Sequence, residues 1–139
     1  MASLQSTIVD GAIIHKEGAA TTSGTTLTID YSTGTTFELD METFGAGPSG
    51  DIDTFTVNNV TGDSYYKSFI LHVIQHTTLW NTENSNFINF TWASINNVKW
   101  PGGSGPTLTA TNDKKDIYSF TSWDNGTTWY GKVIGQNYS

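Results

Sequence analysis

The chain has 139 residues, which is the size of a single domain that buries about two-thirds of its unfolded surface. Its formal charge is −7 and it has only six Lys and Arg residues, so binding along the phosphates of a nucleic acid is excluded. It contains no cysteine, which excludes a disulfide framework and a Cys-ligated zinc site.

The remaining composition favours a packed β protein. Charged residues make up only 14% of the chain and aromatic residues 13%, while roughly a third of it is Thr, Ser and Asn. This combination predicts a β core under a surface of hydroxyl and amide groups. The longest apolar run, residues 69–74, is strand length and far below the ~20 residues of a membrane span. The first five residues lack the basic and apolar regions of a secretory signal.

Residues 1–24 are expected to form an N-terminal arm or edge segment. Ile8-Val9 and Ile13-Ile14 are candidates for an edge strand, and residues 18–24 have the Gly, Ala, Thr and Ser composition of a flexible connector. Two interpretations of this segment stay open. It is either an exposed arm that pairs with a neighbouring subunit or a disordered terminus.

Apolar and polar residues alternate with period two from residue 25 onwards. The alternation in residues 27–31 and 37–41, joined by Ser32-Thr33-Gly34, predicts a β-hairpin over residues 25–42. Further strands are predicted at Ile52–Val60, Tyr65–His76, Phe87–Ala93, Lys115–Ser122 and Thr127–Ile134. Because turn-rich breaks separate these strands and no helical pattern occurs, residues 25–139 are predicted to form one all-β domain, a β-sandwich or jelly roll.

Few residue groups in the chain suggest catalysis or metal binding. His72 and His76 would lie about 13 Å apart on a strand, which is too far for two ligands of one ion. Pairs of acidic residues in loops are candidate calcium ligands, but none follows the EF-hand pattern: Asp51 with Asp53, and Asp113 with Asp116. The carboxylates of Glu38, Asp40 and Glu42 share one face of a strand, which we expect to be solvated. We therefore expect no enzyme activity, no cofactor and no resident metal.

The segment from 122 to 129 fits S-x-D-x-G-x-T-W, the Asp-box pattern, and resembles a hairpin that repeats in sialidase propellers. Its turn chemistry is readable directly, since an Asn-Gly pair tolerates positive φ at both positions of a tight turn. We expect the Asp124 carboxylate to accept backbone N–H bonds across that turn and Trp129 to cover it. The hairpin residues are Ser122, Asp124, Asn125, Gly126, Thr128 and Trp129. A sialidase would need repeated boxes and an arginine cluster, and neither is present.

Five tryptophans remain to be assigned. Trp92 alternates with Ile88 and Phe90, which is a core pattern. The others that adjoin turns or loops could contact sugar rings or a subunit interface, and these candidate contact residues are Trp80, Trp100 and Trp123. Core and hairpin packing is the alternative for at least three of the five tryptophans.

Four motifs stand out in the last third of the chain: Trp100-Pro101-Gly102-Gly103, Pro106–Thr109, Asp116–Phe120 and Gly126-Thr127-Thr128-Trp129-Tyr130-Gly131. With these motifs, this part of the chain resembles a C-terminal module of tailed-bacteriophage structural proteins, including tail-fibre and head-surface proteins. A weaker similarity covers residues 66–93. The resemblance implies an all-β virion protein without catalytic activity that assembles as a homotrimer.

Within the virion, the resemblance leaves two functions open. The chain has no coiled coil, repeat array or long shaft, so it best fits a capsid decoration, or cement, protein that clamps neighbouring capsomers on the head exterior. Its partners would be the major capsid protein or other virion proteins, with neither nucleic acid nor membrane. The alternative is a short tail-fibre, adaptor or head-fibre domain that binds host-surface glycans.

Overall fold

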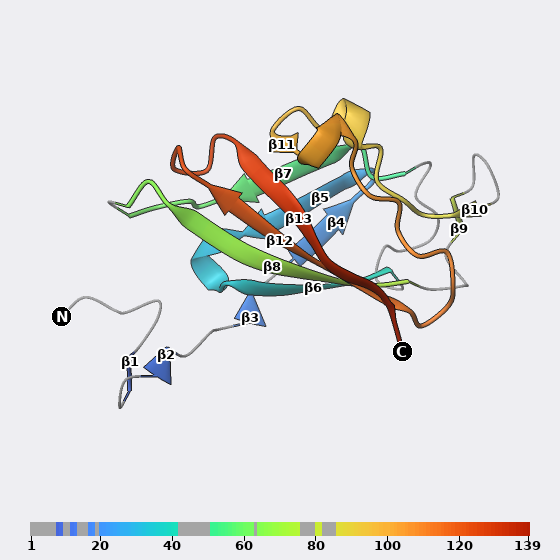
Figure 1. The fold of residues 1–139 in the computed structure, drawn as a ribbon, viewed down its shortest axis with the longest axis horizontal. Helices are drawn as coiled ribbons and strands as arrows, with labels where there is room; N and C mark the ends of the chain where they lie inside the picture. Colours follow the sequence, from blue (N-terminus) through green and yellow to red (C-terminus); the bar gives the residue numbers. More distant parts are fainter. Residues whose placement is uncertain are drawn as a thin grey trace.

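The computed structural model describes residues 8–9, 12–13, 17–18, 20–41, 51–62, 64–75, 80–81 and 86–139. Within these ranges the chain consists of strands and short 3-10 turns, without an α-helix (Figure 1). The strands are β1 (Ile8–Val9), β2 (Ala12–Ile13), β3 (Glu17–Gly18), β4 (Ala20–Ser23), β5 (Thr26–Asp30), β6 (Thr36–Asp40), β7 (Thr54–Asn58), β8 (Lys67–Ile74), β9 (Trp80–Asn81), β10 (Asn86–Phe87), β11 (Val98–Lys99), β12 (Lys115–Ser122) and β13 (Trp129–Tyr138). The all-β fold predicted from the sequence is confirmed.

Two sheets form the body of the protein. The larger has six strands in the order β11-β13-β12-β8-β6-β3, and the smaller has three in the order β4-β5-β7. The ring of Phe55 in β7 stacks on Phe69 in β8 and on Phe120 in β12, with centroid distances of 6.3 and 5.3 Å. The smaller sheet therefore packs face to face with the larger one, which makes the architecture a β-sandwich (Figure 1).

Both sheets are mixed. Strand β12 pairs antiparallel with both β8 and β13, whereas β5 runs parallel to β7 and β6 runs parallel to β8. These parallel pairs distinguish the sandwich from a purely antiparallel jelly roll. Two small antiparallel pairs, β1 with β2 and β9 with β10, complete the described strands.

The central strands follow the alternation of the sequence. In β8 the inward residues are Lys67, Phe69, Leu71 and Val73, and in β12 they are Asp116, Tyr118, Phe120 and Ser122. The two strands pair so that Phe120 lies opposite Phe69, with ring centroids 5.0 Å apart. Burying each such ring contributes about 1.5–3 kcal/mol, so these strands supply much of the driving force for folding.

The hairpin predicted over residues 25–42 is wrong. Strands β5 and β6 belong to different sheets, and the chain crosses between them through the 3-10 turn Tyr31–Thr33. Asp30 stabilises this crossing by accepting hydrogen bonds from the backbone N–H of Ser32 at 3.1 Å and from Asn59 Nδ2 at 3.0 Å. The apolar faces of the two strands therefore oppose each other across the core instead of lying side by side.

The flexible connector predicted for residues 18–24 is also wrong. Residues 20–23 form β4, which pairs antiparallel with β5, and Gly24 supplies the positive φ of 58° in the turn between them. Gly18 pairs with Phe37 in β6, and an added Cβ would lie 2.2 Å from the Phe37 ring. The small residues thus serve close packing and a tight turn rather than flexibility.

The strand predicted at Phe87–Ala93 is only partly correct. Strand β10 ends at Phe87, and Phe90 then makes an isolated bridge to Ile52 before the chain enters the 3-10 turn Trp92–Ser94. Trp92 is partly buried because its ring stacks on Phe90 at 4.3 Å and its Nε1 donates to the Pro106 carbonyl at 2.8 Å.

Candidate functional site

The Asp-box residues meet in the turn between β12 and β13. Ser122 is fully buried, and its hydroxyl accepts from Gly126 N and donates to Asp124 Oδ1, both at 2.8 Å. The same carboxylate oxygen accepts from Thr128 N at 2.8 Å. Asn125 and Gly126 have positive φ values of 57° and 85°, as a tight Asn-Gly turn requires.

The hydrogen bonds also fix the charge of the turn. The backbone N–H of Thr128 and the hydroxyl of Ser122 lower the pKa of Asp124 below its ordinary value, because both stabilise the ionised carboxylate. Asp124 is therefore an ionised carboxylate held by its own turn. This arrangement explains the motif through backbone geometry and assigns it no chemical step.

The Asp-box turn rests on the segment that precedes β8. Asn125 N donates to the Tyr65 carbonyl at 3.0 Å, and Gly126 lies so close to Val60 that an added Cβ would be 2.7 Å from the Val60 Cγ1 atom.

A substitution at Gly126 tests the contact with Val60. Gly126→Ala should lower the free energy of unfolding by about 2–3 kcal/mol, because it adds a clash to the cost of left-handed backbone for a non-glycine residue.

A matched variant separates these two costs. Gly102 also has a positive φ, 71°, but an added Cβ would meet nothing within 4 Å. Gly102→Ala should therefore cost only the conformational part, about 1 kcal/mol. Urea titrations of both variants measure the difference, and equal losses would show that Val60 does not hold the turn.

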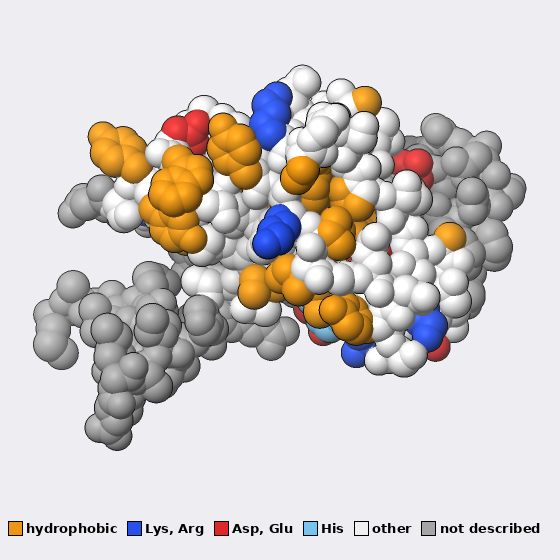
Figure 2. Space-filling view, in the orientation of Figure 1, with side chains coloured by type: hydrophobic (Ala, Val, Ile, Leu, Met, Phe, Trp, Pro, Cys, Tyr) orange, Lys and Arg blue, Asp and Glu red, His pale blue; other side chains and the backbone are white. Residues whose placement is uncertain are grey.

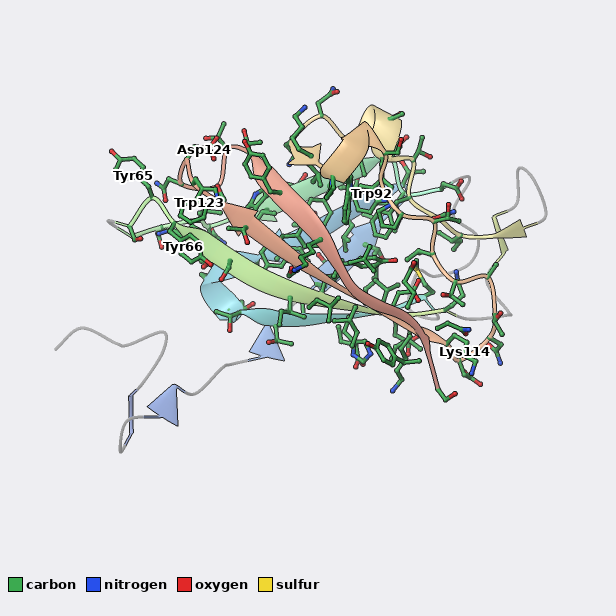
Figure 3. All side chains as sticks on the ribbon, viewed as in Figure 1. Tyr65, Tyr66, Trp92, Lys114, Trp123 and Asp124 are labelled. Atoms are coloured by element: carbon green, nitrogen blue, oxygen red, sulfur yellow. The ribbon has the colours of Figure 1, made fainter. Side chains whose placement is uncertain are left out.

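Contact between the turn and the preceding segment gathers three exposed aromatic side chains, which we call the aromatic platform: Tyr65, Tyr66 and Trp123. Their exposed fractions are 74%, 47% and 66%. The rings of Tyr66 and Trp123 lie 4.7 Å apart at an angle of 57°. Figure 3 shows Tyr66 and Trp123 close together near Asp124, with Tyr65 farther out at the same end, and Figure 2 shows hydrophobic side chains clustered at this end of the molecule.

The other tryptophans proposed as contact residues differ from Trp123. Trp100 is only 9% exposed, because it packs against Trp92 and Phe120 with centroid distances of 4.7 and 5.7 Å. Its assignment as a surface contact is therefore wrong. Trp92 and Trp100 both line a hollow of about 220 Å³ beside the 3-10 turn Pro101–Gly103. The side chain of Trp80 lies outside the described residues.

Asp116, proposed as a calcium ligand, is instead the centre of a buried hydrogen-bond network. Its carboxylate accepts from Thr109 N and Thr109 Oγ1 at 2.7 Å, and from Asn137 N at 2.9 Å. Tyr118 Oη and Gln136 Nε2 add two further bonds at 3.1 Å. Burial opposes ionisation, but these bonds outweigh it and lower the pKa of Asp116 below its ordinary value.

The same network sets the state of Tyr118. Burial, followed by the charge of Asp116, raises the pKa of the Tyr118 hydroxyl well above its usual range. The hydroxyl therefore stays protonated and donates to the carboxylate. The network links β12 to the end of β13 and to the segment before β12, which is a structural role.

The remaining candidate metal ligands do not converge. Among the residues that the structure describes, no three His, Asp or Glu side chains lie close enough to hold one ion. His72 Nδ1 lies 3.5 Å from Glu38 Oε2 on the adjacent parallel strand, whereas His76 and Glu42 lie outside the described residues. Asp51 accepts from Asn89 N at 3.0 Å and so joins two loops.

Beyond Tyr130, the side of β13 away from β12 has no strand partner among the described residues, although Gly131 lies against the Trp100 ring and Gln136 Nε2 donates to the Thr107 carbonyl at 2.7 Å. Strand β11 pairs only with Trp129 and Tyr130, and no described strand pairs with residues 131–138 on the side away from β12. Three apolar side chains are exposed on this stretch: Val133 at 38%, Ile134 at 49% and Tyr138 at 46%. We call residues 131–138 the β13 edge. In Figure 1, β13 runs along β12 to the C-terminus.

No family model, curated protein or solved structure matches the chain. Within the described part of the chain, no helix has the length and apolar character that crossing a membrane requires.

Sequence reasoning missed three features of the surface and core. The role of Asp116 had a readable signal, because this residue shares its alternation phase with Tyr118 and Phe120 and is therefore directed inward. The sequence pattern predicts a strand that starts at Tyr65, whereas β8 begins at Lys67 and leaves Tyr65 and Tyr66 before it. The β13 edge could not be read from the sequence, since strand order decides which strand has an open side.

Proposed function

We propose that this protein is a non-enzymatic structural protein of a bacteriophage virion, a capsid decoration protein that clamps neighbouring capsomers on the head exterior. The observation that carries the proposal is the open, apolar β13 edge. Because the C-terminal third resembles a module of phage structural proteins, we propose that this surface contacts other proteins of a virion.

An open strand edge is a template for pairing with another chain. Proteins that remain monomeric protect such edges with lysine, proline, bulges or a covering segment. The β13 edge has no proline, but it has Lys132 as its one charged residue, and its pairing with β12 shifts register on both sides of Gly135. Contact with another protein would therefore be made by its exposed apolar side chains and not by a regular ladder of backbone hydrogen bonds.

Charge favours the same surface for contact between copies of this chain. The whole chain has a formal charge of −7, so two copies repel each other over most orientations. The β13 edge has no Asp or Glu and carries the positive charge of Lys132. We propose that it contacts a neighbouring copy in the homotrimer that the resemblance implies, and that the assembled copies bind the major capsid protein.

Self-association through the β13 edge is tested by mass. Ile134→Lys places a positive charge on the β13 edge, so any subunit contact formed there would have to bury a cation, which weakens association. The stability of the folded monomer should change little, because Ile134 is 49% exposed. Sedimentation at micromolar concentration should give a trimer for the wild type and a monomer for the variant. Lys99→Ala on β11, also exposed, is the control that should remain trimeric.

Two results would overturn the clamp. A wild-type monomer at these concentrations would remove self-association, and an unchanged trimer in Ile134→Lys would remove the β13 edge from it. Binding to the head is tested separately by sedimenting the purified chain with capsids that lack it. A decoration protein should co-sediment at a saturating number of copies per capsid.

A second function is favoured by one observation, the aromatic platform. A short tail-fibre, adaptor or head-fibre domain that binds host-surface glycans would need exposed, rigidly held rings. Trp123 meets that requirement, because it is 66% exposed and lies within the hydrogen-bonded Asp-box turn.

A further inference from the structure

We propose that the aromatic platform of Tyr65, Tyr66 and Trp123 binds an uncharged saccharide. This inference rests on the glycan-binding function and specifies its site and ligand class; it does not depend on assembly through the β13 edge. Five observations carry it: ring geometry, rigidity, charge, size and separation from the core.

The ring geometry suits a sugar. The faces of Tyr66 and Trp123 meet at 57° with centroids 4.7 Å apart, and both side chains are about half exposed or more. An aromatic face carries partial negative charge and attracts the polarised C–H groups on one face of a pyranose ring. The tilt lets one ring stack on the sugar while the other contacts its edge.

The platform is held in place before any ligand arrives. Trp123 lies in the turn closed by hydrogen bonds among Ser122, Asp124 and Thr128. The Asn125 N–H bond to the Tyr65 carbonyl fixes the tyrosine segment against that turn. Because these backbones are already ordered, a ligand loses little of its binding energy to ordering the protein.

Local charge selects an uncharged ligand. Asp124 is exposed beside Trp123 and is ionised, since its turn hydrogen bonds lower its pKa. The lysine at the start of β8, Lys67, is 6% exposed and donates its Nζ proton to the Ser64 carbonyl. The Asp124 carboxylate would therefore repel an anionic sugar or a phosphate, and the buried Lys67 is not available to offset that repulsion.

Size distinguishes a saccharide from a protein partner. A stable protein interface buries about 800 Å² on each side, which is far more than three side chains provide. One or two sugar rings match the extent of the platform. The tyrosine hydroxyls and the Asp124 carboxylate at its rim can exchange hydrogen bonds with sugar hydroxyls.

The platform is also separate from the core. Trp123 points outward from a turn whose other tryptophan, Trp129, is fully buried. Removing the Trp123 ring therefore leaves the packing of the sandwich intact. This separation allows binding to be tested without loss of folding.

The test uses the full-length chain and defined probes. Cellohexaose, maltohexaose and chitohexaose represent uncharged saccharides, and oligogalacturonate represents an anionic one. We expect at least one uncharged probe to shift the tryptophan fluorescence saturably. Trp123→Ala should weaken that binding by about tenfold or more, as loss of one stacked ring predicts, whereas Trp123→Phe should retain most of it.

Two control variants separate this site from the rest of the protein. Tyr138→Ala removes an exposed ring outside the platform and should bind as the wild type does. Ile134→Lys should also bind normally, so a failed clamp and a failed saccharide site give different results. Absence of binding to all three uncharged probes, equal binding by Trp123→Ala, or binding of oligogalacturonate alone would overturn the proposal.

Discussion

Trp129→Ala is expected to lower the free energy of unfolding by about 4 kcal/mol, because Trp129 is the largest fully buried side chain of the described residues. Trp129 has no exposed surface, and its ring lies 4.9 Å from Phe69 and 6.1 Å from Tyr31. Truncation removes the buried ring and leaves a cavity between the sheets. Because domains of this size are stable by about 5–15 kcal/mol, the loss should be large in a urea titration.

The matched control for Trp129 lies in the same motif. Trp123→Ala removes the same side-chain type from a 66% exposed position and should change stability by about 0.5 kcal/mol or less. Trp129→Phe, which keeps a ring in the core, should fall between the two. Equal losses in Trp123→Ala and Trp129→Ala would show that the Asp-box tryptophan does not anchor the sandwich.

Asp116→Asn is expected to lower the free energy of unfolding by about 3 kcal/mol at neutral pH. The carboxylate is 2% exposed and accepts bonds from Thr109, Asn137, Gln136 and Tyr118. The asparagine amide would direct an N–H₂ group at some of these donors, leaving buried polar groups without partners. Asp113→Asn is the control, because Asp113 is exposed and its positive φ of 59° suits asparagine.

The loss in Asp116→Asn should depend on pH in one direction. The folded-state pKa of Asp116 is lowered from its ordinary value of 3.8, so ionised Asp116 adds stability above that value. This contribution is lost as pH falls below 3.8 through the folded pKa. The stability difference between wild type and Asp116→Asn should therefore shrink under acid conditions. A difference that grows as the pH falls would contradict an ionised, hydrogen-bonded Asp116.

The strands near the C-terminus were predictable because local chemistry specifies them. Strand β12 has the predicted bounds, Lys115–Ser122, since its alternation is uninterrupted. The turn that follows has an Asn-Gly pair with the expected positive φ at both positions. Strand β13 extends to Tyr138, beyond the predicted end at Ile134. The sequence does not reveal this extension, because both faces of the strand are exposed there and apolar and polar residues do not alternate.

Connections between strands were not predictable in the same way. Alternation in residues 27–31 and 37–41 identifies two strands but does not distinguish a hairpin from a crossing between sheets. That choice depends on Asp30, whose side chain binds both Ser32 and the distant Asn59. The aromatic platform has the same origin, because it depends on a contact between Asn125 and Tyr65 far apart in the sequence.

A reconstruction of the intact phage particle tests the central proposal most directly. If the protein is a capsid decoration protein, density for the sandwich should occupy specific positions on the head exterior. The β13 edge of each copy should contact its neighbour there. A particle without this chain, or with the chain only at the tail, would contradict the decoration function.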